Sequence, residues 1–111
     1  MSMTEEIFTF QDPREYLKSV LEYKKKSGSK MSLRVLATRA GLSSPSTLSM
    51  IITGKRTFTP RVAEKLARAL KLSGRKKEYL VAMASKDSAR TEEEKIIASE
   101  SLVKLRTHRR E

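Results

Sequence analysis

The sequence predicts an all-α protein, a compact bundle of about five to six helices formed by residues 1–111 as a single domain. Apolar residues recur at helical spacing along most of the chain, and no alternating β-branched stretch is long enough for a convincing strand. Helix-start signals, in which a capping residue precedes proline, occur at Asp12-Pro13, Ser44-Pro45 and Thr59-Pro60. The core of the bundle is expected over about residues 12–85, with a C-terminal helix over about 91–108.

The first four helices follow from these caps and from the apolar face that each helix carries. The first begins at Asp12-Pro13 and has an apolar face of Tyr16, Leu17, Val20 and Leu21. The second lies between Ser32 and Gly41 and buries Leu33, Leu36, Ala37 and Ala40. The third and fourth begin at the other two proline signals, and their inward residues are Leu48, Ile51, Ile52, Val62, Ala63, Leu66, Ala67 and Leu70.

Two more helices and an N-terminal arm complete the expected bundle. The fifth helix begins near Ser73 and runs to about Ser85, with one face formed by Tyr79, Leu80 and Met83. The sixth follows a polar, mobile break at residues 86–90 and begins with the capping-box spacing of Thr91 and Glu94. Residues 7–10 are a weak strand candidate, which we expect to be an extended arm that packs its apolar side chains on the bundle.

The charge balance gives the first indication of function. Lys and Arg number 24 and Asp and Glu number 13, so the net charge is +11. Such a surplus creates a positive field whose commonest partner is nucleic acid, with an anionic membrane surface as the main rival. There is no cysteine, no apolar run approaches the roughly 20 residues of a membrane span, and no secretory signal is visible. The cytoplasm is therefore the expected compartment.

Residues 32–56 have the pattern of a helix-turn-helix, in which a tight turn joins two short helices. Ala37 is small enough to let the second helix approach closely, and Gly41 permits a left-handed backbone at the turn. Leu42, Leu48 and Ile51 are expected to lock both helices onto the core. In this motif the first helix lies across the DNA backbone, and the second presents its outer face to the major groove.

These residues resemble the lambda-repressor-like family of DNA-binding domains over about residues 16–70, including the spacing of Ala37 and Gly41 and the closing Gly54-Lys55-Arg56. Leu48 lies one position further from Gly41 than in the usual family pattern, so the turn is expected to be one residue longer. The chain is also similar, through residues 91–95, to the N-terminal region of larger bacterial predicted transcriptional regulators that carry a further C-terminal domain. This resemblance implies a regulator, either a fragment or a natural short member.

The expected DNA contacts form two sets. Hydroxyl and methyl groups on the outer face of the third helix can serve base edges, and this set is Ser44, Ser46, Thr47, Ser49 and Met50. Groups at the ends of the motif can hold phosphates, and this set is Ser32, Arg34, Lys55, Arg56 and Thr57. The alternative is a solvated face whose cations only complement helix dipoles. The basic runs at residues 24–26 and 75–77 are weaker candidates.

Nothing in the sequence points to an enzyme, a cofactor or a metal site, because it has no His-carboxylate cluster and no glycine-rich phosphate loop. His108, the single histidine, lies in a basic tail and is expected to be solvated. Sequence-specific binding of double-stranded DNA is the expected function. A protein-interaction or oligomerisation module without an operator is the alternative. RNA binding is disfavoured by an aromatic content of only 5%.

The last expected helix carries more apolar surface than a short terminal helix needs. Its apolar residues are Ile96, Ile97, Leu102, Val103 and Leu105. A second copy is the common route to useful operator affinity for a domain that contacts one half-site. We therefore expect a homodimer through the fifth and sixth helices. The alternative is that the last helix folds back onto the first and fifth helices and completes a monomeric core.

Overall fold

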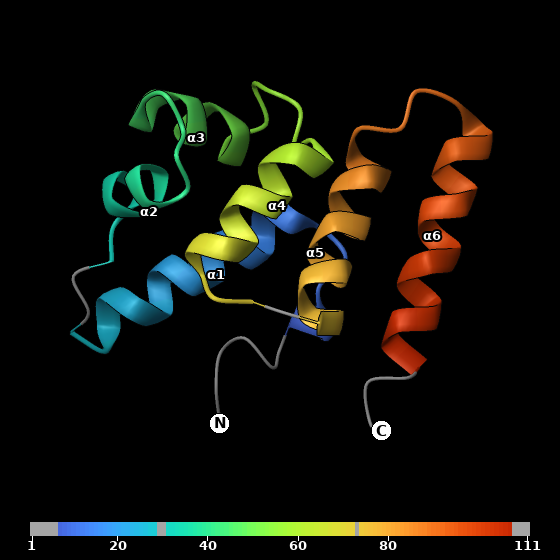
Figure 1. The fold of residues 1–111 in the computed structure, drawn as a ribbon, viewed down its shortest axis with the longest axis horizontal. Coiled ribbons are helices and arrows are strands. Elements are labelled where there is room, and N and C mark those ends of the chain that lie inside the picture. Colours follow the sequence, from blue (N-terminus) through green and yellow to red (C-terminus); the bar gives the residue numbers. More distant parts are fainter. Residues whose placement is uncertain (1–6, 29–30, 73, 108–111) are drawn as a thin grey trace.

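The computed structural model describes residues 7–28, 31–72 and 74–107, and six helices account for most of them (Figure 1). These are α1 (Pro13–Lys26), α2 (Leu33–Arg39), α3 (Pro45–Ile52), α4 (Pro60–Ala69), α5 (Gly74–Asp87) and α6 (Glu92–Thr107). The described ranges contain no strand, so the predicted all-α class is confirmed. The body measures 38 × 32 × 18 Å, and α2 and α6 lie towards opposite ends of its longest axis.

The predicted helix starts are confirmed, and three of the four caps form the expected hydrogen bond. The Asp12 carboxylate accepts from the Arg14 N–H at 2.9 Å, and Thr59 Oγ1 accepts from the Val62 N–H at 3.3 Å. Ser32 Oγ accepts from the N–H three residues later in the same way. The Ser44 side chain makes no such bond, although α3 begins directly after it. Local sequence therefore sets where each helix begins.

The ends of α2 and α3 share one backbone motif. After α2, Gly41 adopts φ +76°, its N–H donates to the Thr38 carbonyl at 3.1 Å, and the next N–H donates to the Ala37 carbonyl at 3.0 Å. Gly54 repeats the arrangement after α3 with φ +88°. This pair of bonds satisfies carbonyls that a helix end leaves open, and it requires a left-handed residue, which glycine supplies without steric cost.

The predicted apolar faces of α1 to α5 form a single buried core. Its largest fully buried side chains include Tyr16, Leu17, Leu36, Leu48, Ile51, Leu66, Tyr79, Leu80 and Met83. Leu21, Leu33 and Val62 are only partly buried and pack against the edge of this cluster. Phe58, in the loop before α4, is fully buried as well, although the helical periodicity did not indicate it.

The N-terminal segment differs from its expected form. Residues 7–9 make a short 3₁₀ turn, closed by the Phe10 N–H donating to the Ile7 carbonyl at 3.1 Å, so the prediction of an extended arm is wrong. The predicted packing does hold, because Ile7 is fully buried and Phe8 lies against the Tyr79 ring. The Tyr79 hydroxyl donates to the Phe10 carbonyl at 2.6 Å. A side-chain donor from α5 thus satisfies a carbonyl of this segment.

α6 folds back against α5 and buries Ala98 and Leu102 there (Figure 1). The Glu94 N–H donates to Thr91 Oγ1 at 3.1 Å, and the Glu94 carboxylate accepts from the Arg90 N–H at 2.9 Å, which closes a capping box shifted by one residue. The expected mobile break at residues 86–90 is wrong for its first part, because α5 continues to Asp87. Ser73 and His108 lie outside the described residues.

Candidate nucleic-acid interface

The helix-turn-helix consists of α2, the connection at residues 40–44, and α3. Leu36 and Ala37 of α2 and Leu48 and Ile51 of α3 are buried, with at most 2% of each side chain exposed. Leu42 is partly buried and packs on the same cluster. The inner faces of both helices are therefore fixed by the core, which leaves the opposite face of α3 in a defined orientation at the surface.

The predicted base-contacting residues differ in exposure. Ser46 and Met50 are exposed one helical turn apart, while Ser44, Thr47 and Ser49 are half-buried. Thr53, which follows α3 in the same register, is exposed too, although the sequence analysis did not name it. The face that α3 offers to a ligand is thus narrow and made of small polar groups around one flexible thioether.

Hydrogen bonds within the protein already engage some of these hydroxyls. Ser44 Oγ and Thr47 Oγ1 lie 3.4 Å apart, so one hydroxyl donates to the other. Thr53 Oγ1 donates to the Ser49 carbonyl at 3.0 Å, which ties it to the end of the helix. A hydroxyl that donates can still accept, so these groups remain suitable for donors on base edges. Ser46 has neither constraint in the described structure.

The predicted phosphate-contacting residues are all exposed: Ser32, Arg34, Lys55, Arg56 and Thr57. Ser32 Oγ accepts the cap bond from Val35, which leaves its own proton available to a phosphate oxygen. Lys55 and Arg56 lie in the turn that follows α3, and both of their backbone N–H groups donate to the Met50 carbonyl, at 2.8 and 3.1 Å. The two cations are thus anchored to the helix that would enter the groove.

The segment around the motif is free of carboxylates. Between Glu22 and Glu64 there is no Asp or Glu, while nine Lys and Arg residues occur there. The overall net charge predicted a basic protein but not this concentration, which a count along the sequence would have detected. An uninterrupted positive segment removes the repulsion that a carboxylate would exert on approaching phosphates.

Arg14 and Asp87 form a junction that the sequence analysis missed. The Arg14 guanidinium donates through Nε to the Ile51 carbonyl at 2.7 Å and through Nη2 to the Arg56 carbonyl at 3.0 Å. Its Nη1 pairs with Asp87 Oδ1 at 2.5 Å, and Asp87 Oδ2 accepts from the Phe58 N–H at 3.1 Å. Side chains of α1 and α5 thereby hold both ends of the loop that carries Lys55, Arg56 and Thr57.

A signal for this junction does exist in the sequence. Arg14 lies in the first turn of α1 and Asp87 is the last residue of α5, so each charge is at the end of its helix where the macrodipole opposes it. A charge at an unfavourable helix end is expected to have a specific partner. This expectation could have suggested that Arg14 and Asp87 pair with each other.

Two other kinds of site are absent from the described residues. None of their helices is both long and apolar enough to cross a membrane. They also hold no group of three His, Cys, Asp or Glu side chains that could bind a metal ion.

Comparison with known protein families matches residues 22–76 to the helix-turn-helix family. The matched segment begins near the end of α1, contains all of α2, α3 and α4, and ends in the first turn of α5. It includes the carboxylate-free segment and every predicted DNA contact. No curated protein and no solved structure matches the chain.

Proposed function

Because residues 22–76 match the helix-turn-helix family, we propose that the protein binds duplex DNA sequence-specifically as a bacterial transcriptional regulator of the lambda-repressor-like kind. The observation that carries this proposal is the carboxylate-free segment that contains α2 and α3, which combines exposed cations with a narrow polar face on α3. The proposal assigns the protein to the cytoplasm, where a bacterial chromosome lies.

In the proposed complex α3 enters the major groove, and Ser46 and Met50 lie at its contact face. A serine hydroxyl can donate to or accept from several base edges, and the methionine methyl can contact a thymine methyl group. Such small side chains discriminate weakly, so sequence-dependent DNA shape would supply part of the specificity. Ser44, Thr47 and Ser49 contribute at the edge of the same face.

Phosphates on either side of the groove are held by the two ends of the motif. Lys55, Arg56 and Thr57 contact the backbone beyond the end of α3, and Ser32 and Arg34 contact it at the start of α2. The Arg14–Asp87 junction holds the first group in place, since it accepts and donates hydrogen bonds on both sides of that loop. It acts as a positioning pair and does not touch DNA.

Selection of duplexes from a random pool at physiological salt tests this proposal. We expect a short enriched motif for the unmodified chain and weak, sequence-independent binding for Lys55→Ala/Arg56→Ala. The matched control is Lys86→Ala/Lys95→Ala, which removes the same charge outside the helix-turn-helix. Absence of any enriched motif would overturn sequence specificity. A double variant at Lys55 and Arg56 that matched its control would remove those residues from the interface.

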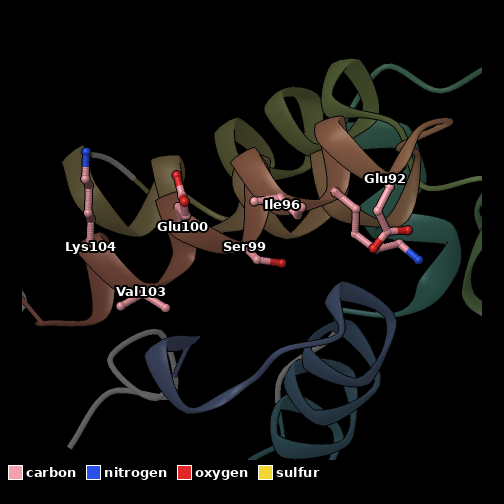
Figure 2. Close-up of a pocket in the computed structure, with 7 residues that line it drawn as sticks. Glu92, Ile96, Ser99, Glu100, Val103 and Lys104 are labelled. Atoms are coloured by element: carbon pink, nitrogen blue, oxygen red, sulfur yellow. The ribbon is translucent and has the colours of Figure 1, made fainter.

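We further infer that the protein acts as a homodimer through the outer face of α6. Ile96 and Val103 are 51% and 52% exposed, and with Ser99 between them they line a shallow groove along the helix (Figure 2). Large β-branched side chains on one helix face are the usual content of a helix–helix contact. This exposed apolar face favours a dimeric regulator. It would also be expected of an interaction module that does not bind DNA.

The charges along α6 support pairing with a second copy in antiparallel orientation. Glu92, Glu93 and Glu94 occupy the first turn, while Lys104 and Arg106 occupy the last. Figure 2 shows Glu92 at one end of the groove and Lys104 at the other. An antiparallel partner would bring its basic end to this acidic end, and the two helix dipoles would also oppose each other favourably.

The structure shows which residues should be substituted to test the proposed dimer. Leu102 is only 3% exposed because it packs in the core against α5, so the expectation that it belongs to a free pairing surface is wrong. Substitution of Ile96 and Val103 with Ser should instead give a folded monomer in sedimentation, with weaker operator binding. Ile97→Ser on the neighbouring face is the matched control. A monomeric unmodified chain, both free and on DNA, would end this inference.

A further inference from the structure

A second concentration of positive charge lies outside the helix-turn-helix. Residues 61–77, which form α4 and the beginning of α5, contain seven Lys and Arg residues and one carboxylate, Glu64. None of the predicted DNA contacts falls in α4, and the basic run at 75–77 is only a weak candidate by sequence. The two segments meet in space because α4 packs directly against α5.

Four of these cations line one groove, which we call the α4–α5 groove. Arg61, Lys65 and Arg68 follow one another at one-turn spacing along α4, and Lys77 contributes from α5. The remaining lining residues are Glu64, Leu72 and Gly74, and none belongs to α2 or α3. Within the described parts of the chain these four cations form no ion pair, and they share the groove with a single carboxylate, Glu64, so the lining has a surplus of positive charge.

Two cations beside the groove occupy positions that cost stability. Lys71 adopts φ +62° in the turn after α4, in the same backbone motif for which α2 and α3 use glycine. Arg75, the second residue of α5, adds positive charge to the positive end of that helix, whose first turn contains no acidic residue. At both positions a cation stands where glycine or an acidic residue would give a more stable chain. Such departures from local preference are characteristic of a functional surface.

The shape of the groove selects the class of ligand. From Arg61 to Arg68 the row extends roughly 10 Å at the ~1.5 Å rise of a helix. Measured along the duplex axis, one DNA strand has about three phosphates in that length, at ~3.4 Å of axial rise per phosphate. An open row of separate cations cannot enclose a small anion, whereas it can contact successive phosphates of a polyanion.

We propose that the α4–α5 groove binds the phosphate backbone of a second DNA segment, distinct from the one that α3 reads. This proposal rests on the proposed function, because it assumes that DNA is the polyanion near the protein. The groove contacts are expected to be independent of sequence, because phosphates carry no sequence information directly. One chain would thereby hold two duplex segments together, or fold one flexible DNA back on itself.

The test compares three variants with the unmodified chain. The groove variant is Lys65→Gln/Arg68→Gln/Lys77→Gln, and the charge control is Lys86→Gln/Arg90→Gln/Lys95→Gln, which removes three cations elsewhere. The motif variant is Lys55→Ala/Arg56→Ala. Short duplexes of random sequence, each long enough for one motif, are titrated in excess, and sedimentation gives the number of duplexes bound per chain.

We expect the unmodified chain and the charge control to bind two duplexes per chain at low salt, and the groove variant to bind one. The motif variant should keep binding through the groove, with a salt dependence that falls by about 0.9 in log–log slope for each groove cation then removed. A groove variant that equals its charge control in stoichiometry and slope would overturn the proposal. Because sequence selection on α3 is measured separately, failure of the groove leaves the proposed function standing and the two results are distinguishable.

Discussion

The α2–α3 pair and the α5–α6 pair pack in the same way but have different outer surfaces. Each pair buries an apolar face in the common core and is joined by a short connection. The outer face of α2–α3 has cations and small hydroxyls and no carboxylate, whereas α6 begins with three glutamates and exposes Ile96 and Val103. Packing therefore determines the fold of both pairs, while the surface residues determine which kind of partner each pair can bind.

The largest effect is expected from a substitution that removes the Arg14–Asp87 junction between the two helix pairs. Arg14→Met removes the two hydrogen bonds to the α3 end and the ion pair with Asp87, whose side chain is 23% exposed. We expect the free energy of unfolding to fall by about 2–3 kcal/mol, because charged hydrogen bonds are lost and a half-buried carboxylate is left alone. Duplex affinity should fall as well, since the loop carrying Lys55 loses its anchor. Urea denaturation and duplex titration measure the two effects.

Lys18→Met is the matched control for this change. It removes the exposed pair between Lys18 and Glu15, at 3.5 Å on the same helix, in which both side chains are more than half exposed. Exposed pairs contribute little to stability, so we expect a change within about 0.5 kcal/mol. If Arg14→Met were no less stable than Lys18→Met, the junction would have no role in holding the two pairs together.

The second prediction distinguishes the proposed DNA-binding face of α3 from the proposed pairing face of α6. Met50→Ala removes the one large apolar group from the outer face of α3, where it is 36% exposed. We expect the ratio of specific to non-specific affinity to fall by about 1 kcal/mol, the lower end for loss of a base contact, with no change in oligomeric state. A preserved motif and ratio would show that the assigned register of α3 is wrong.

Much of the fold could be predicted from sequence because its determinants are local. Caps such as Asp12 and Thr59 and glycines such as Gly41 act within a few residues, and helical periodicity identified the buried faces. The Arg14–Asp87 junction joins residues far apart in sequence, and its only sign in the sequence is that each charge lies at the unfavourable end of its helix. Residues 7–9 also escaped, because their 3₁₀ turn depends on packing against Tyr79 rather than on propensity.

The candidate interface was predictable in its position but not in its detail. The spacing of Ala37 and Gly41 located the motif, and the residues after α3 followed from it. The mutual hydrogen bond of Ser44 and Thr47 depends on side-chain rotamers that sequence does not specify. The packing of Leu102 against α5, with Val103 exposed beside it, likewise depends on how α6 is rotated about its axis, which the mixed pattern of that helix leaves open.

A third effect concerns the core that both helix pairs share. The Tyr16 hydroxyl is buried and has no hydrogen-bond partner, and burial raises the pKa of this phenol above its ordinary value. We expect Tyr16→Phe to increase the free energy of unfolding by about 1 kcal/mol at neutral pH, because the cost of desolvating an unpaired hydroxyl disappears. Thermal or urea unfolding measures the change.

The raised pKa also determines the pH dependence of this variant. Below pH ~10 the phenol is protonated in both states, so its titration gives the stability no pH dependence in that range. Above pH ~10 the unfolded state loses the proton and the native state retains it, so the unmodified chain loses about 1.4 kcal/mol per pH unit from this group. Tyr16→Phe should therefore gain over the unmodified chain as the pH rises. A constant difference from pH 8 to pH 11 would contradict this assignment.

The smallest expected effect lies in the turn between α4 and α5, where stability and charge oppose each other. Lys71→Gly relieves a left-handed conformation that costs a side chain about 1–2 kcal/mol, and the greater freedom of glycine in the unfolded chain offsets about half of this. We expect a net gain of about 0.5 kcal/mol in the free energy of unfolding. The same change should lower the salt dependence of DNA binding by at most about 0.9 in slope, since it deletes one cation beside the α4–α5 groove. Lys71→Ala separates the two causes, because it removes the charge without supplying a residue suited to positive φ. It should show the same loss in DNA binding and no gain in stability. A Lys71→Gly protein that was more stable and bound DNA with an unchanged slope would mean that this lysine occupies a strained position for no electrostatic reason.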